Sequence, residues 1–286
     1  MKNQKSLIRH LLLLGLIVSN LNSADFNILF TANINGSLEN CKCGKIPLGG
    51  IARIKSFIDA IAAKNAQCLV VDGGDFFNSY PFFELNQAML KSIELLKYDL
   101  FLPGDQEFVE GIKFYNLLIE RLKPNLLLSN LENQKNIKRS FKFNTIKVDI
   151  YGFLSPKSFE FITKPKKLSL LPFSSLQNVI DTSVCNIVVF HGPIQEAEKC
   201  AQEYKWIDLI LLAHDQQLDP KQVFNTIIIG CGQDSEYITV IAVEKLNDRW
   251  HFDINQEPVG PSIPEDKSIT QIINSYHEKQ KSNLKQ

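Results

Sequence analysis

Short apolar runs recur along the chain, and several end in a polar residue of a type that binds metal or forms hydrogen bonds. The runs and the polar residues after them are 28–30 with Asn33 and Asn35, 69–71 with Asp75, 100–102 with Asp105, 187–190 with His191, and 209–212 with His214. Runs of this kind are typical of buried strands. Open α/β sheets build ligand sites beyond the carboxyl ends of such strands, so the pattern indicates a metal or anion site.

The remaining sequence alternates strand-like and helical segments. Strands are expected over 26–32, 68–72, 99–102, 125–129, 145–153, 186–190, 208–212, 225–229, 237–243 and 250–254. Helices are expected near 50–63, 84–96, 111–122 and 194–204, and a polar helix follows the Pro-rich link from Pro258 to Pro264. This order predicts an α/β fold with two packed β-sheets flanked by helices, a four-layer α/β/β/α sandwich.

Composition agrees with one sizeable domain. The chain has 286 residues, of which 44% are apolar, and its 31 basic and 31 acidic residues give a net charge of zero. A neutral chain has no long-range field that would favour nucleic acid or an anionic membrane. We therefore expect no nucleic acid, and this charge is compatible with a small ligand. The sequence does not define a protein partner.

The amino terminus has the layout of a secretory signal peptide. Lys2, Lys5 and Arg9 precede an apolar stretch over 11–18, and the small residues Ser23 and Ala24 follow. The stretch is too short to span a bilayer as a helix, although an uncleaved amphipathic anchor is an alternative. We expect a signal peptide over 1–24, a domain over 25–257, and a link with a carboxy-terminal helix over 258–286. The protein is then exported, to the periplasm or outside the cell.

Six sequence blocks, in order, resemble motifs of one known family. They are Asn33-Ile34-Asn35-Gly36, Gly49-Gly50-Ile51-Ala52-Arg53, Gly74-Asp75-Phe76-Phe77, Gly104-Asp105-Gln106-Glu107-Phe108, Phe190-His191-Gly192 and Ala213-His214-Asp215-Gln216. This series resembles the calcineurin-like metallophosphoesterases, in particular the catalytic domain of bacterial periplasmic 5′-nucleotidase and UDP-sugar hydrolase. The resemblance runs from about Phe26 to Val243 and implies the four-layer fold. We expect no counterpart here of the family's carboxy-terminal nucleotide-specificity domain, and we therefore do not carry nucleotide specificity over.

The resemblance implies a metal site. Family members hold two divalent cations that share a bridging carboxylate, at the position of Asp75. One cation would here be held by Asp75, Asp105, His191 and His214, a set suited to Zn²⁺, Mn²⁺ or Fe²⁺. Two buried carboxylates carry two negative charges, which one divalent ion neutralises. For either histidine alone, burial against backbone partners is the better explanation, whereas their joint position favours one metal ion, with no ion as the alternative.

The second cation of the family is not expected. It would need Asn33, Asn35 and Gln216, whose neutral amides bind a divalent cation more weakly than carboxylate or imidazole. Gln106 stands at the position of the family's catalytic histidine and offers no titratable proton. The four amides are either decayed ligands or a neutral hydrogen-bonding pocket. The resemblance thus implies a phosphoesterase with reduced or lost hydrolysis; the alternative is a non-catalytic extracytoplasmic binding or scaffold protein on the same fold.

Six cysteines occur in a chain that we expect to be exported, and export permits disulfides. Cys41 and Cys43 follow the first-strand motif and, with Cys231, are expected near the site. Exported relatives carry similar Cys-x-Cys segments, which implies a disulfide that staples the loop. A thiolate metal site with Cys41 and Cys43 is the alternative. Cys68 and Cys185 adjoin apolar strands, and we expect buried free thiols there.

Overall fold

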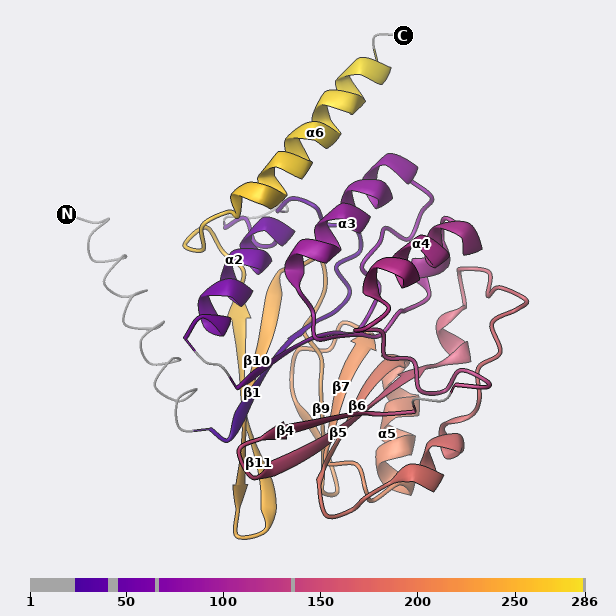
Figure 1. Ribbon diagram of the computed structural model, residues 1–286, viewed down its shortest axis with the longest axis vertical. Helices are drawn as coiled ribbons and strands as arrows, with labels where there is room; N and C mark the ends of the chain where they lie inside the picture. Colours follow the sequence, from indigo (N-terminus) through magenta and orange to yellow (C-terminus); the bar gives the residue numbers. More distant parts are fainter. Residues whose placement is uncertain (1–23, 41–45, 65–66, 135–136, 285–286) are drawn as a thin grey trace, which may run out of the picture.

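The computed structural model describes residues 24–40, 46–64, 67–134 and 137–284. Most of the expected signal peptide, together with Cys41 and Cys43, lies outside the described residues. The described strands form two sheets (Figure 1). The first has the order β11-β10-β1-β2-β3, with β1 Phe26–Thr31, β2 Cys68–Asp72, β3 Leu100–Phe101, β10 Tyr237–Leu246 and β11 Arg249–Pro258. The second has the order β4-β5-β6-β7-β9-β8, with β4 Arg139–Phe143, β5 Ile146–Leu154, β6 Cys185–Gly192, β7 Leu209–His214, β8 Lys221–Val223 and β9 Thr226–Ile229.

The two sheets lie between two layers of helices, so the predicted four-layer α/β/β/α sandwich is confirmed. The helices of the described chain are α2 Ile51–Ala62, α3 Phe83–Leu96, α4 Ile112–Leu122, α5 Ile194–Glu203 and α6 Lys267–Asn283. Figure 1 shows α2, α3, α4 and α6 gathered on one side of the molecule and α5 on the other.

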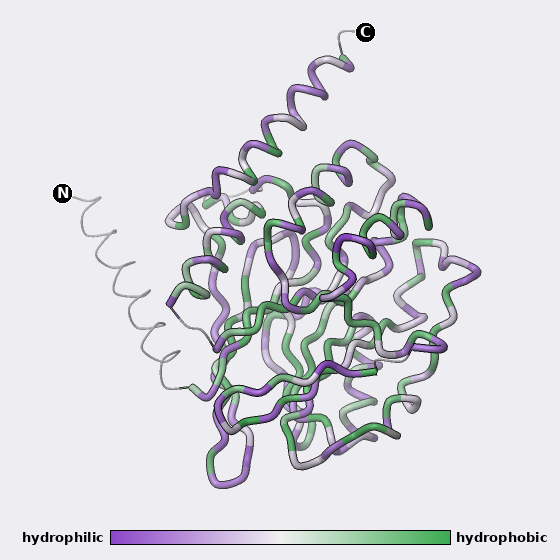
Figure 2. The backbone as a smooth tube through the Cα atoms, viewed as in Figure 1, coloured by the Kyte–Doolittle hydropathy of each residue, from purple (hydrophilic) through white to green (hydrophobic). Residues whose placement is uncertain are grey.

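Strand β6 shows why its apolar run is unbroken. Ile187 and Val189 belong to the core that both sheets share, whereas Val188 and Phe190 belong to a second core with Ala197 of α5. Successive strand residues face opposite sides, and both sides of β6 are covered, so every position is apolar. Figure 2 shows the same distribution, because the central strands are mostly green and α6 and the tip of the β10–β11 hairpin are mostly purple.

Parallel pairing brings the expected ligands to one edge of each sheet. β1 pairs in parallel with β2, and β2 with β3. In the second sheet β5, β6 and β7 are also parallel, with Gly192 opposite His214. The carboxyl ends of parallel strands lie at the same edge, so the residues that follow β2, β3, β6 and β7 are neighbours.

The main differences from the sequence prediction concern short strands. The segment 125–129 was expected to be a strand, but it forms an isolated bridge in which Leu126 pairs with Phe101. It cannot extend a ladder because it passes from one sheet to the other: Leu127 N donates to Phe101 O, and Ser129 N donates to Gly152 O. The edge strands β4 and β8 were not predicted, since both are short and largely polar.

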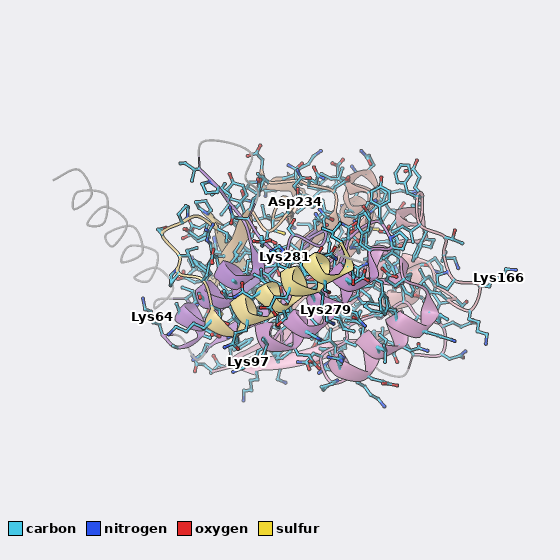
Figure 3. The ribbon with its side chains drawn as sticks, turned by 90° about the horizontal axis from the view of Figure 1, so that it is seen from above. Lys64, Lys97, Lys166, Asp234, Lys279 and Lys281 are labelled. Atoms are coloured by element: carbon cyan, nitrogen blue, oxygen red, sulfur yellow. The ribbon has the colours of Figure 1, made fainter. Side chains whose placement is uncertain are left out.

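Helix α6 packs across the outside of α2 and α3 (Figure 3). It begins at Asp266, whose carboxylate caps the helix by accepting from Ser268 N and Ile269 N. Ile269 and Ile273 are its buried residues, while Lys279 and Lys281 lie further along its exposed length. No helix within the described ranges is both long and apolar enough for a membrane crossing.

Candidate metal centre

The four residues expected to hold a cation lie together at the edge where the two sheets meet. Asp75 follows β2, Asp105 follows β3, His191 lies near the end of β6 and His214 ends β7. One ligand atom from each lies within 4.8 Å of the others. Asp75, Asp105 and His191 are buried, and His214 is half-buried. The strands therefore position two carboxylates and two imidazoles around one point.

His191 is oriented by the backbone of the opposite sheet. Its Nδ1 atom lies 2.8 Å from the carbonyl oxygen of Gly73, which can only accept, so Nδ1 carries a proton. Nε2 then faces Asp75 Oδ1 at 3.3 Å and Asp105 Oδ1 at 3.2 Å. A neutral imidazole would direct a lone pair at these carboxylates. The contact is favourable when a proton or a metal cation lies between them.

His214 has an unsatisfied ring nitrogen at the same point. Its Nδ1 lies 3.3 Å from Asp105 Oδ1 and 3.8 Å from Asp75 Oδ2, yet it is buried without a well-formed hydrogen bond in the described structure. Its backbone N–H donates to Asn33 Oδ1 at 2.8 Å, which fixes the start of the loop. A buried ring nitrogen directed at two carboxylates, without a hydrogen bond, is the arrangement that a divalent cation would complete.

The charges of the site are strongly coupled. Burial opposes the charge on His191, but the neighbouring carboxylates prevail and raise the pKa of His191 well above its ordinary value. Burial also opposes the charge on His214, but the nearby carboxylates of Asp105 and Asp75 raise its pKa to about 9. Burial alone would raise the pKa of Asp75, but the two imidazoles hold it below its usual range. Without metal, two protons balance the two carboxylates; a bound cation would replace them.

The loops of the site have an unusual backbone. Asn33, Asn35, Asp75 and His214 have φ values of 52°, 54°, 56° and 75°. These values lie in the left-handed region, which a residue other than glycine rarely adopts. Strained conformations of this kind cluster at functional sites because the surrounding structure holds them.

Glu107 holds two of these loops in place. It is fully buried, and its carboxylate accepts from the backbone N–H groups of Asp75 at 3.0 Å, Phe76 at 2.8 Å, Phe77 at 3.4 Å and Gly104 at 2.5 Å. Burial and the charge of Asp75 raise the pKa of Glu107 to about 8, against the pull of the N–H donors. Glu107 was not predicted as a site residue, although its place beside Asp105 and Gln106 in a family motif was a signal.

The amides expected to line a vacant second cation position do not act alike. Asn33 is tied to the backbone, because it donates to Gly232 O at 2.9 Å and to Asp215 O at 3.2 Å. Asn35 and Gln106 contact each other, with Gln106 Nε2 3.0 Å from Asn35 Oδ1. Gln216 is exposed and makes no side-chain hydrogen bond within the described residues. Gln216 is therefore open to solvent, and its place beside this position stays a prediction.

Cys231 lies behind the site as a free thiol. It is buried, and its Sγ lies 3.5 Å from the carbonyl oxygen of Ala32. Cys68, Cys185 and Cys200 are free as well. Burial raises the pKa of Cys231, with a further contribution from Asp72. Cys41 and Cys43, where a disulfide that staples the loop is expected, lie outside the described residues, and Cys231 is a free thiol that takes no part in a disulfide.

The donor set fits one divalent cation. Two carboxylates and two imidazoles are ligands for Zn²⁺, Mn²⁺ or Fe²⁺, and one doubly charged ion neutralises both carboxylates. One ring nitrogen of each histidine points at carboxylate oxygens. The other ring nitrogen of His191 is held by Gly73 O, and the backbone N–H of His214 is held by Asn33 Oδ1, as is common for ligating histidines. The architecture is the fold of solved calcineurin-like phosphoesterase and 5′-nucleotidase structures.

Solved structures with this fold come from several bacteria. NAD nucleotidase (NadN) of Haemophilus influenzae superposes with a TM-score of 0.77 at 14% sequence identity, covering 90% of this chain and 60% of the other. The 5′-nucleotidase precursor of Thermus thermophilus gives a TM-score of 0.76 at 17% identity, with coverages of 91% and 60%. The calcineurin-like phosphoesterase YfkN of Bacillus subtilis gives 0.71 at 17% identity, with coverages of 91% and 99%.

These likenesses concern the fold. This chain spans about three-fifths of the length of the two nucleotidase structures. No protein-family model matches the sequence, and neither does the sequence of any curated protein. The chain therefore has the 5′-nucleotidase-like metallophosphoesterase fold, while its own chemistry must be argued from its residues.

Proposed function

We propose that the protein is an exported metallophosphoesterase-like protein that binds one divalent cation and hydrolyses small phosphate esters with reduced efficiency. The observation that carries the proposal is the convergence of Asp75, Asp105, His191 and His214 within 4.8 Å, with two ring nitrogens turned to two carboxylates. A bound cation would supply Lewis-acid polarisation of a phosphate oxygen and would acidify water.

The chain's own residues would hold and orient the reactants. Asp75 and Asp105 provide the anionic ligands, while His191 is kept in the required tautomer by Gly73. Glu107 fixes the loop that carries Asp75. The backbone strain at Asp75 and His214 is held by these contacts, so the ligands are pre-organised before substrate binds.

Two features support a reduced rate. The imidazole of the family's catalytic histidine is replaced by Gln106, which can offer a neutral hydrogen bond but no proton. Loss of such a group commonly lowers a rate by about two to four powers of ten. One cation also lacks the paired stabilisation of entering and leaving oxygens that two metals give.

A specific observation favours a second candidate, a non-catalytic binding or scaffold protein. Both N–H groups of the Gln106 amide are already engaged, by Asn35 Oδ1 and by Asp75 Oδ2 at 3.2 Å. Gln106 then has no N–H left for a phosphoryl oxygen. The metal site could in that case serve ligand binding or stability without turnover.

Export is part of the proposal and rests on the sequence of residues 1–24. Among the solved structures, one with this fold is described as a 5′-nucleotidase precursor. The substrates and partners of the longer nucleotidases are not carried over, and a small phosphate ester is the proposed ligand class.

The test combines metal analysis with turnover. The purified protein is loaded with Zn²⁺ or Mn²⁺, and bound metal is measured by elemental analysis beside hydrolysis of an aryl phosphate and of nucleotides. One ion with turnover that His191→Ala abolishes supports the hydrolase. One ion without turnover supports the binding protein, and no bound ion contradicts both forms of the proposal.

A further inference from the structure

A chain of hydrogen bonds links the surface carboxylate of Asp234 to the buried carboxylate of Asp75. Asn35 Nδ2 donates to Asp234 Oδ1 at 2.9 Å, and Gln106 Nε2 donates to Asn35 Oδ1 at 3.0 Å. The same nitrogen of Gln106 donates to Asp75 Oδ2 at 3.2 Å. Figure 3 labels Asp234, which lies in the loop before β10.

The two ends of this chain determine how both amides point. A carboxylate can only accept, so Asn35 must present its amino group to Asp234 and its oxygen to Gln106. Gln106 must then present its amino group to both Asn35 and Asp75. The reverse orientation of Gln106 would place its oxygen against Asn35 Oδ1 and Asp75 Oδ2, which repel it.

Gln106 keeps this orientation at a cost. Its Oε1 atom is buried and lacks a hydrogen-bond partner in the described structure. A buried acceptor without a partner is destabilising, so the two N–H contacts must outweigh it. The orientation of the amide is therefore fixed by its hydrogen bonds to Asp75 and Asn35, and not by any hydrogen bond to its oxygen.

Gln106 Nε2 lies at a point where a second cation would bind. The lone pairs of Asp75 Oδ2 and Asn35 Oδ1 converge on this nitrogen. Both side chains are among those that a second cation would need as ligands. Two oxygens that converge on one point attract either a cation or N–H donors.

We infer that the amino group of Gln106, oriented through Asn35 by Asp234, takes the place of a second cation and limits the centre to one ion. This inference rests on the proposed function, which supplies the first ion. It makes Gln106 a positioning residue, because its amino group satisfies Asp75 Oδ2 and its backbone N–H donates to Asp75 Oδ1 at 3.1 Å, while Oδ1 also faces His191 at 3.3 Å.

Metal stoichiometry tests the inference. The wild type, Gln106→Glu and Gln106→Met are equilibrated with excess Mn²⁺, desalted and analysed for manganese. Gln106→Glu keeps the shape but replaces the donor by an anionic oxygen, so we expect two ions, against one in the wild type. Gln106→Met removes the amide without adding a ligand, so we expect one. Two ions in the wild type, or one in Gln106→Glu, would overturn the inference.

A second measurement needs no metal. In protein treated with chelator, the Gln106 amide protons are identified by NMR from their loss in Gln106→Met. We expect their exchange with water to be at least tenfold slower than for the exposed Gln216, and to accelerate in Asp234→Asn. Exchange as fast as that of Gln216 would overturn the inference even if the wild type bound no metal, an outcome that would contradict the proposed function separately.

Discussion

His191 Nδ1 donates a 2.8 Å hydrogen bond to the carbonyl oxygen of Gly73, and this contact joins the second sheet to the first at the candidate metal centre. His191 belongs to β6, and Gly73 directly follows β2. The imidazole thus has two tasks, because one nitrogen holds the sheets together and the other faces the carboxylates.

Two substitutions separate these tasks. Asparagine places an amide N–H near the position of Nδ1, so we expect His191→Asn to keep the contact with Gly73 and to lose the cation. Glutamine reaches the position of Nε2, so His191→Gln should keep weak metal binding but lose about 1–3 kcal/mol of stability in metal-free protein. Metal titration and urea unfolding check both results. Undiminished metal binding in both variants would show that Nε2 is not a ligand.

Gly104 is predicted to tolerate no side chain. A Cβ atom at this position would overlap the His191 ring and Asp75 Oδ1. We therefore expect Gly104→Ala to abolish binding of one equivalent of Mn²⁺ while the circular dichroism spectrum stays native. Gly260→Ala is the matched control, because its Cβ would meet nothing nearer than 3.6 Å and should leave metal binding unchanged.

Replacement of Glu107 should weaken both the fold and the site. In Glu107→Gln one acceptor oxygen becomes an amino group that faces backbone N–H donors, so we expect a loss of about 1–3 kcal/mol, as for buried donors left without an acceptor. Metal affinity should fall by about 10–100-fold, as for other residues that orient ligands. Chemical unfolding and metal titration measure these effects. Glu110→Gln, which alters a carboxylate bound by the single donor Asn86, should have a smaller effect on both.

Thiol labelling tests the cysteine assignments. Burial and the charge of Asp99 raise the pKa of Cys68 to about 12, and burial does the same for Cys200. Because the thiolate is the reactive form, these thiols should resist alkylation at pH 7 in the native protein and react more as pH rises.

Labelling after unfolding counts the free thiols. Without reductant, four sites should be modified, namely Cys68, Cys185, Cys200 and Cys231. All six cysteines should react after reduction, since we propose a loop-stapling disulfide in the Cys-x-Cys segment and the other four thiols are free. Mass spectrometry measures the number of modified cysteines before and after reduction. Six modified sites before reduction would rule out this disulfide.

The sequence was sufficient to predict where the four candidate ligands meet. Asp75, Asp105, His191 and His214 each stand at or just beyond the end of a buried run, and parallel strands bring such positions to one edge. The orientation of Gln106 was not predictable in this way, because it depends on Asp234, whose loop is distant in sequence. Gln216 was placed by motif position alone, yet the backbone leaves it exposed.

The left-handed backbone at Asn33 and Asn35 affects how such a centre can change over evolution. Asparagine enters this region more readily than most residues. An asparagine can therefore remove a charged or imidazole ligand from these loops while the chain path survives. Loss of one half of a two-ion centre then has little effect on folding, and the remaining half can be inherited unaltered.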